Sequence, residues 1–156
     1  VLSGNGNTGA DPEVLVAISN LSANMGAANI TQIEFVTTSF DKSDGGNIDV
    51  LVRFNEPVTV TGTPQVSITN GNQGTGTGRG PHLASYLSGS TTNELTFRFT
   101  LGAANAATNE NDVLVIGTNA TGLNSGTIKD TGEGTVATIT NTSAQGTAAG
   151  SITVAA

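Results

Sequence analysis

The chain of 156 residues carries 12 acidic and five basic residues, a net charge of −7, and no cysteine. This length fits one domain with room for a modest extension, and the lack of cysteine excludes disulfides and thiolate metal sites. The acidic balance disfavours nucleic acid and anionic membranes as partners, because phosphate binding requires clustered Lys and Arg, and no apolar run approaches the ~20 residues of a membrane span.

The surface is expected to be polar but largely uncharged. Charged residues make up 11% of the chain, against about 25% in typical soluble domains. Disorder combines low hydrophobicity with high charge, whereas 36% of this chain is hydrophobic and only 4% is aromatic. We therefore expect a folded protein with a thin core of Val, Ile, Leu and Phe, covered by Thr, Asn, Ser and Gly.

Residues 1–31 differ from the rest of the chain and are expected to form an N-terminal arm. Residues 1–10 are rich in Gly, Asn, Ser and Thr, whereas the residues after Pro12 form a short apolar run. This run either completes the sheet of its own domain or reaches a neighbouring subunit and adds a strand there. On the second alternative, the assembly contacts in the arm are Val14, Leu15, Val16 and Ile18.

The body of the protein consists of segments with alternating apolar and polar residues. The alternation is clearest in residues 48–55 and 95–101, and it is typical of half-buried strands in an antiparallel sheet. Pro57 is expected to end its strand, and the Gly-rich residues 70–81 are expected to form a long exposed loop. The predicted strands are residues 33–38, 48–55, 65–69, 83–87, 93–101, 112–116, 123–129 and 135–140.

Seven to eight short strands at this spacing predict an all-β protein, an antiparallel β-sandwich over residues 32–142. No segment with helical periodicity competes with them. Residues 143–156 are expected to form a C-terminal linker with one short strand at residues 152–154. In that strand, Ile152 and Val154 are further candidate contacts with a neighbouring subunit.

Three motifs point to a known class of domain. F-x-E-P-V-x-V-x-G-x-P-x-V spans residues 54–66, Y-x-S-G-S spans residues 86–90, and L-N-x-G-T-I-x-D spans residues 123–130. Together they resemble the immunoglobulin-like repeat of bacterial surface adhesins, and similar domains in virion proteins of tailed phages, especially those of marine bacteria. The resemblance covers residues 33–140. It implies an immunoglobulin-like sandwich with extended arms, used for adhesion, spacing or decoration, with no common active site.

One feature departs from the adhesin pattern. Adhesin repeats occur in long tandem arrays, whereas this chain holds a single copy of the pattern with its own extensions at both ends. This difference favours a stand-alone structural subunit over a slice of a giant adhesin, although a fragment of an adhesin would look the same.

The sequence contains no recognisable catalytic constellation. His82 is the only histidine, and no serine in a nucleophile-elbow context accompanies it. Residues 4–9 match G-x-G-x-x-G by letter but lack the preceding strand that a dinucleotide site requires. Four N-x-[ST] sequons are expected by chance in a chain this rich in Asn, Ser and Thr, and they occur at Asn20, Asn29, Asn119 and Asn141.

Acidic and amide residues in three predicted turns form one candidate metal site. Gathered at one end of a sandwich, their oxygens could bind calcium, which takes six to eight oxygen ligands. The spacing does not match the EF-hand loop, and Asp and Asn are favoured in turns in any case, so no metal ligand and no cofactor is assigned. The residues concerned are Asp41, Asp44, Glu110, Asn111, Asp112 and Asp130.

The sequence favours a non-enzymatic structural protein of a phage virion, a decoration or cement subunit on the capsid exterior. Its expected partners are the major capsid protein or other structural proteins, and further copies of itself, with no nucleic acid and no membrane. The alternative is a bacterial or archaeal cell-surface protein, either an adhesin module or a filament subunit that donates its N-terminal strand. A carbohydrate-binding role is disfavoured, because the chain has no Trp and one Tyr for stacking on sugars.

Overall fold

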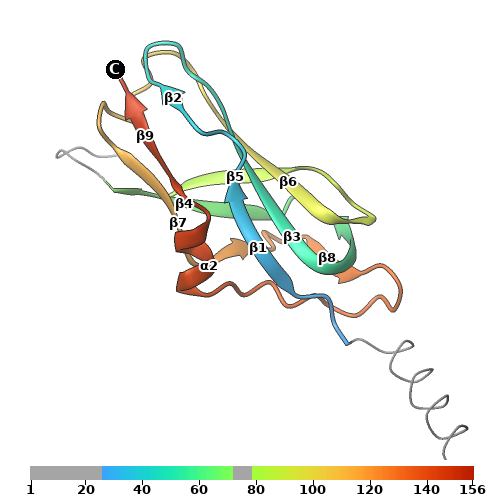
Figure 1. The fold of residues 1–156 in the computed structure, drawn as a ribbon. Helices are drawn as coiled ribbons and strands as arrows, with labels where there is room; N and C mark the ends of the chain where they lie inside the picture. The colour runs from blue at the N-terminus through green and yellow to red at the C-terminus, as the bar shows by residue number, and fades with distance from the viewer. Residues whose placement is uncertain (1–25, 72–78) are drawn as a thin grey trace, which may run out of the picture.

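The computed structural model describes residues 26–71 and 79–156, which form one curled sheet of nine strands with a single short helix (Figure 1). This confirms the prediction of an all-β fold. The sheet order is β1-β3-β6-β5-β4-β7-β9-β2, and β8 pairs with β3. The elements are β1 (Ile30–Phe35), β2 (Phe40–Asp41), β3 (Gly46–Thr61), β4 (Gln65–Gly71), β5 (His82–Ser88), β6 (Thr92–Leu101), β7 (Val113–Gly122), β8 (Thr127–Asp130), α2 (Ser143–Ala148) and β9 (Ser151–Ala155).

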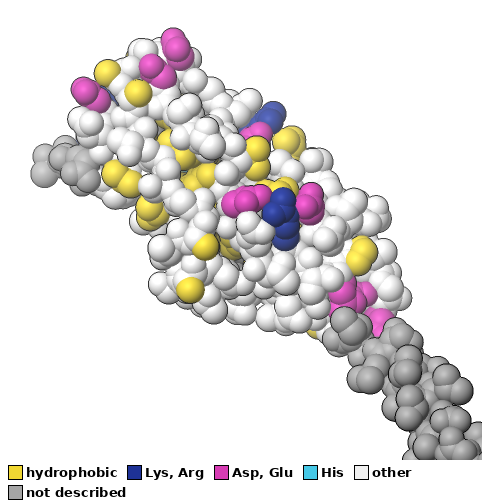
Figure 2. All heavy atoms as spheres, viewed as in Figure 1, with side chains coloured by type: hydrophobic (Ala, Val, Ile, Leu, Met, Phe, Trp, Pro, Cys, Tyr) yellow, Lys and Arg dark blue, Asp and Glu magenta, His cyan; other side chains and the backbone are white. Residues whose placement is uncertain are grey.

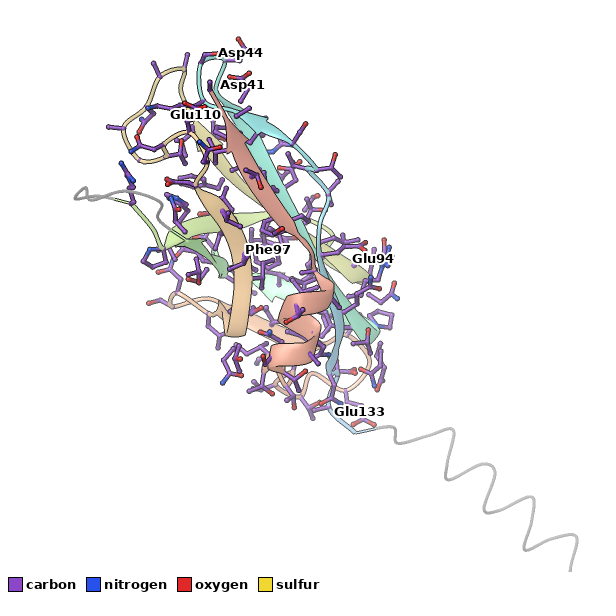
Figure 3. All side chains as sticks on the ribbon, turned by 60° about the vertical axis from the view of Figure 1, so that its left-hand side comes forward. Asp41, Asp44, Glu94, Phe97, Glu110 and Glu133 are labelled. Carbon is purple, nitrogen blue, oxygen red and sulfur yellow. The ribbon has the colours of Figure 1, made fainter. Side chains whose placement is uncertain are left out.

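The core lies inside the curl, and the alternating residues of β3 and β6 form its centre. Val50 pairs with Phe97 and Val52 with Leu95 in the antiparallel register, and all four side chains are fully buried. The intervening residues face outward, as the period-two pattern predicts. Figure 3 shows Phe97 in the interior of the body.

β3 runs through Pro57, where the sequence predicted that the strand would end. Its register with β6 breaks between Arg53 and Val58, so the proline occupies an irregular stretch where no ladder donor is needed. Beyond the break, Val58–Thr61 pair with β8. β3 therefore contacts β1 in its first half and β8 in its second.

The C-terminal residues 143–156, predicted to be a linker with a short strand, form part of the body. Thr142 caps α2 in a capping box: its hydroxyl accepts from the Gln145 N–H, and the Gln145 side chain accepts from the Thr142 N–H. α2 packs so closely on β7 that a Cβ at Gly146 would collide with the Ile116 carbonyl. Such a short helix has no periodicity that a sequence could display, and packing against β7 stabilises it.

β9 is an internal strand of the sheet. It pairs antiparallel with β7 and parallel with β2, so the sheet is mixed rather than wholly antiparallel. Ile152 and Val154 are each 1% exposed and belong to the core. The expectation that these two residues contact a neighbouring subunit is therefore corrected, because their side chains pack inside their own domain.

The body begins at Ala28, before the predicted boundary at residue 32. Ala28 is fully buried and its carbonyl accepts from the Thr138 N–H. The outer edge of β1 is bonded at both ends: Ile30 N–H donates to the Thr138 carbonyl, and Phe35 N–H donates to the Ala149 carbonyl. The arm residues Val14, Leu15, Val16 and Ile18 lie outside the described residues.

Two further local predictions have different outcomes. Residues 135–140 form isolated bridges to Asn29 and Lys129 instead of a strand. The Y-x-S-G-S motif does form a corner, in which the Ser90 N–H donates to the Tyr86 hydroxyl (2.8 Å). A Cβ at Gly89 would collide with the Glu94 carbonyl, so the turn requires glycine at that position. The immunoglobulin-like topology itself remains a prediction.

Candidate functional site

A buried polar cluster closes the core beside the ends of β4 and β7. Asp112, just before β7, is fully buried, and one of its carboxylate oxygens accepts from the Asn70 side chain (3.0 Å) and the Asn109 N–H (2.8 Å). Its other oxygen lies 3.5 Å from the Arg79 guanidinium, whose side chain is 8% exposed. The ion pair and the hydrogen bonds offset the cost of burying the carboxylate.

His82 completes this cluster. Its Nε2 lies 3.2 Å from Asn70 Nδ2, which assigns the acceptor role to Nε2, and its ring stacks on Phe99 with centroids 4.9 Å apart. Burial lowers the pKa of His82 from 6.5, against the opposing effect of Asp112. His82 is 4% exposed and contacts an amide and a phenyl ring, neither of which is a nucleophile. This arrangement stabilises one end of the core.

The acidic residues of the candidate calcium site do not converge. Asp41, Asp44 and Glu110 lie at one end of the molecule (Figure 3). Asp112 is instead buried in the polar cluster with Arg79. Asp130 lies near Glu133, which Figure 3 places at the opposite end. Among residues 26–71 and 79–156, no group of three or more His, Asp or Glu side chains could hold a metal ion. Asn111 adopts a positive φ of 65° in its turn.

Two of these carboxylates instead organise their own turns. The Asp41 carboxylate accepts from the Ser43 hydroxyl (2.6 Å) and the Ser43 N–H (2.8 Å), and these bonds lower its pKa. The Asp130 carboxylate accepts from the N–H groups of Gly132 and Glu133, which lower its pKa in the same way. Favourable turn geometry therefore explains both residues.

At the Asp130 end, three carboxylates lie close enough to influence one another. Partial burial, with the charges of Asp130 and Glu133, raises the pKa of the Glu56 carboxyl. Like charges disfavour ionisation of a neighbouring acid. Carboxylates therefore gather at both ends of the body: Glu56, Asp130 and Glu133 at this one, and Asp41, Asp44 and Glu110 at the other.

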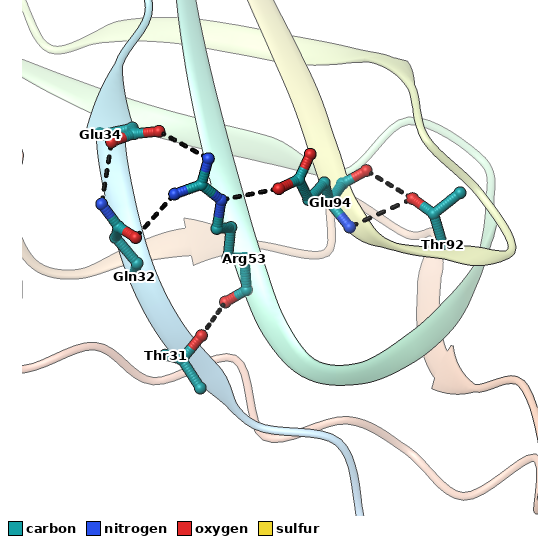
Figure 4. A network of polar contacts seen from close by, with 6 residues as sticks. All are labelled: Thr31, Gln32, Glu34, Arg53, Thr92 and Glu94. Atoms are coloured by element: carbon teal, nitrogen blue, oxygen red, sulfur yellow. Dashed lines mark hydrogen bonds and ion pairs between the residues drawn. The ribbon is translucent and has the colours of Figure 1, made fainter.

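The flank between these acidic ends carries ion pairs. The Arg53 guanidinium bonds Glu94 on β6 (2.8 Å), Gln32 on β1 (2.8 Å) and Glu34 on β1 (3.2 Å), so it joins three adjacent strands (Figure 4). Arg98 forms two parallel 2.7 Å bonds with Asp49 on the neighbouring strand. The Arg53 and Arg98 side chains are 36% and 38% exposed, and ion pairs of such solvated groups contribute little to stability.

Most of the surface is uncharged, because charged residues make up only 11% of the chain. On the face in Figure 2, the few dark-blue groups lie against magenta ones, and white polar and backbone atoms cover most of the rest. Residues 26–71 and 79–156 also contain no helix long and apolar enough to cross a membrane. Their only large hydrophobic side chains that are well exposed are Val36, Leu83, Leu87 and Val136.

The sequons differ in accessibility. Asn141 is 2% exposed, and its side chain donates to the Gly117 carbonyl and accepts from the Ala120 N–H, so it has no free amide for modification in the folded state. Asn29 and Asn119 are exposed, and Asn20 lies outside the described residues. A buried asparagine with matched partners is a structural residue, which a sequon pattern cannot reveal.

Sequence reasoning did not identify the Arg79–Asp112 pair, the Arg53 network or the role of Asn141, since each joins residues that are far apart in the chain. Comparison with protein-family models, with curated proteins and with solved structures finds no match for this chain. The site therefore has to be interpreted from its own geometry.

Proposed function

We propose that this chain is a non-enzymatic structural subunit of a phage virion, a decoration protein that binds the capsid exterior. The observation that carries the proposal is that the outer edge of β1, the first described strand, is already bonded at both ends by later residues of the body. Thr138 and Ala149 cover the edge of β1 by backbone bonds, and the Gln145 side chain donates to the Ile30 and Thr31 carbonyls. In this proposal, the apolar residues of the arm bind a partner instead of pairing with this edge.

In this proposal, Val14, Leu15, Val16 and Ile18 contact the capsid or a neighbouring subunit. Each contact is weak alone, but many copies on one lattice act together, because linked binding events raise the effective concentration of each site. The sparsely charged flanks, where most carboxylates are paired with arginine, support the proposal, since densely displayed subunits with little charge on their sides repel one another weakly.

The test compares the full chain with a chain lacking residues 1–25 and with a Val14→Asp, Val16→Asp double variant. We expect all three to fold, and only the full chain to form a defined oligomer or to bind purified phage capsids stripped of decoration protein. Solution mass is measured by light scattering and capsid binding by co-sedimentation. An unfolded truncated chain, or binding that is unchanged without the arm, would contradict the proposal.

A second candidate is a spacer or adhesin module of a cell surface. It is supported by the position of the chain ends, because the described residues enter the body at one end and the C-terminus lies at the other (Figure 1). Modules in tandem need this arrangement. A protein that stays monomeric and does not bind capsids would favour this candidate, whereas open-ended polymers lost on truncation would favour a donor-strand filament.

A further inference from the structure

A shallow hollow of about 250 Å³ lies on the outer face of the sheet, where β4, β5 and β7 adjoin. Ser67 of β4 pairs with Leu83 of β5, and both line the hollow together with Asn119 of β7. The neighbouring residues Val66 and Ala84 are fully buried, which places the hollow on the side away from the core.

An irregularity in β7 shapes the hollow. Ile68 pairs with Ile116 and Val66 pairs with Thr121, so the single residue between the β4 partners faces the four residues 117–120 of β7. Asn119 lies in this bulge with a φ of 52°. Bulges are frequent beside functional sites, where they redirect side chains.

The bulge is held in place from inside the protein. The buried Asn141 accepts from the Asn119 N–H through its backbone carbonyl (3.1 Å) and from the Ala120 N–H through its side chain (2.7 Å). Its side-chain amide donates to the Gly117 carbonyl (2.8 Å). Three hydrogen bonds from one buried residue fix the backbone of the bulge, so the hollow is preformed.

The lining is uncharged, and its polar side chains lie among a larger apolar surface. The side-chain amide of Asn119 and the hydroxyl of Ser67 make no hydrogen bond within residues 26–71 and 79–156. Both residues are at least partly exposed. Gln65 donates to Ser85 and Asn124 donates to the Thr63 carbonyl, so each keeps its side-chain carbonyl oxygen as an acceptor. Leu83, which is 48% exposed, adds an apolar surface.

We infer that this hollow binds a neutral, polyhydroxylated ligand, a saccharide unit. Side-chain amides and a hydroxyl supply both donors and acceptors, which match sugar hydroxyls that also donate and accept. The lack of Trp for stacking, which disfavoured a carbohydrate-binding role on sequence grounds, is met here by Leu83, whose exposed side chain packs against the C–H face of the ring. The lack of charge in the lining disfavours an ionic ligand, because its desolvation would not be offset. Saccharide binding goes beyond the decoration role and does not depend on it.

The experiment is a titration of the full-length, ¹⁵N-labelled protein with glucose, galactose, mannose and N-acetylglucosamine, followed by two-dimensional NMR. At least one sugar is expected to shift the amide signals of Ser67, Leu83 and residues 119–122 in a saturable way. If no sugar gives saturable shifts there, or if the neutral peptide tetra-alanine shifts these signals and the sugars do not, the inference is overturned.

Matched variants link the shifts to the hollow. Asn119→Gly removes the amide but tolerates the positive φ, and should weaken binding roughly three- to tenfold, as expected for one lost hydrogen bond. The control is Asn111→Gly, at an exposed position with a φ of 65° outside the hollow, which should leave affinity unchanged. Leu83→Ser tests the apolar contact independently of the bulge. Affinity that is unaffected by both Asn119→Gly and Leu83→Ser would contradict the assignment.

Discussion

The protein contains two kinds of polar network that differ in burial. At one end of the core, Asp112 is fully buried and is held by Arg79, Asn70 and Asn109. On the flank, Arg53 lies among Gln32, Glu34 and Glu94 with its side chain 36% exposed. Water can replace lost partners on the flank but not inside the cluster, so similar ion pairs should contribute very differently to stability.

The largest expected effect comes from Asp112→Ala. This change removes a buried carboxylate that pairs with Arg79 and accepts from the Asn109 N–H, and should destabilise the protein by about 3–5 kcal/mol. The measurement is the free energy of unfolding in urea. The control is Asp49→Ala, which removes the partner of the more exposed Arg98 and should cost about 1 kcal/mol or less. Equal losses in the two variants would refute the comparison.

The next largest effect is expected for Asn141→Ala. The change removes an acceptor for Ala120 N–H and a donor to the Gly117 carbonyl, and leaving buried groups unpaired costs about 1–3 kcal/mol each. Urea unfolding and hydrogen exchange at Ala120 would measure the change. Asn141→Asp keeps the acceptor but buries a carboxylate against the Gly117 carbonyl, so at neutral pH it should destabilise the protein at least as much as Asn141→Ala.

A smaller effect should appear with pH. Burial lowers the pKa of His82 below its ordinary value of 6.5, so the unfolded chain takes up a proton at a pH where the folded protein does not. Stability is therefore complete above pH 6.5 and decreases as the pH falls through the window below it. Thermal unfolding at pH 7.5 and 5.5 tests this, and His82→Gln should lose the dependence. A native protein that is equally stable at both values would contradict it.

The smallest effect is expected for Arg53→Ala on the flank. Exposed ion pairs contribute about 1 kcal/mol or less, and salt screens them. Unfolding in urea should therefore show a small loss at low salt that shrinks at high salt. A loss as large as that of Asp112→Ala, or one that does not change with salt, would mean that the flank network is not as solvated as its exposure indicates.

Period-two alternation was sufficient to predict the central strands. Ile48, Val50, Leu95 and Phe97 are apolar at every second position, and this local pattern holds whatever their partners are. Turn chemistry was equally local, as the corner at residues 86–90 shows. The strand ends were less predictable, because Pro57 lies at a break in register that only the pairing with β6 and β8 defines.

The sequence by itself determined that this protein is built from strands, with an uncharged polar surface and an acidic balance, because these properties follow from residue type and short-range periodicity. Only the tertiary structure decided where Ile152 and Val154 lie and which residues frame the hollow around Asn119. It also brought His82 and Asp112 together around Asn70. These features depend on contacts between residues that are distant in the chain.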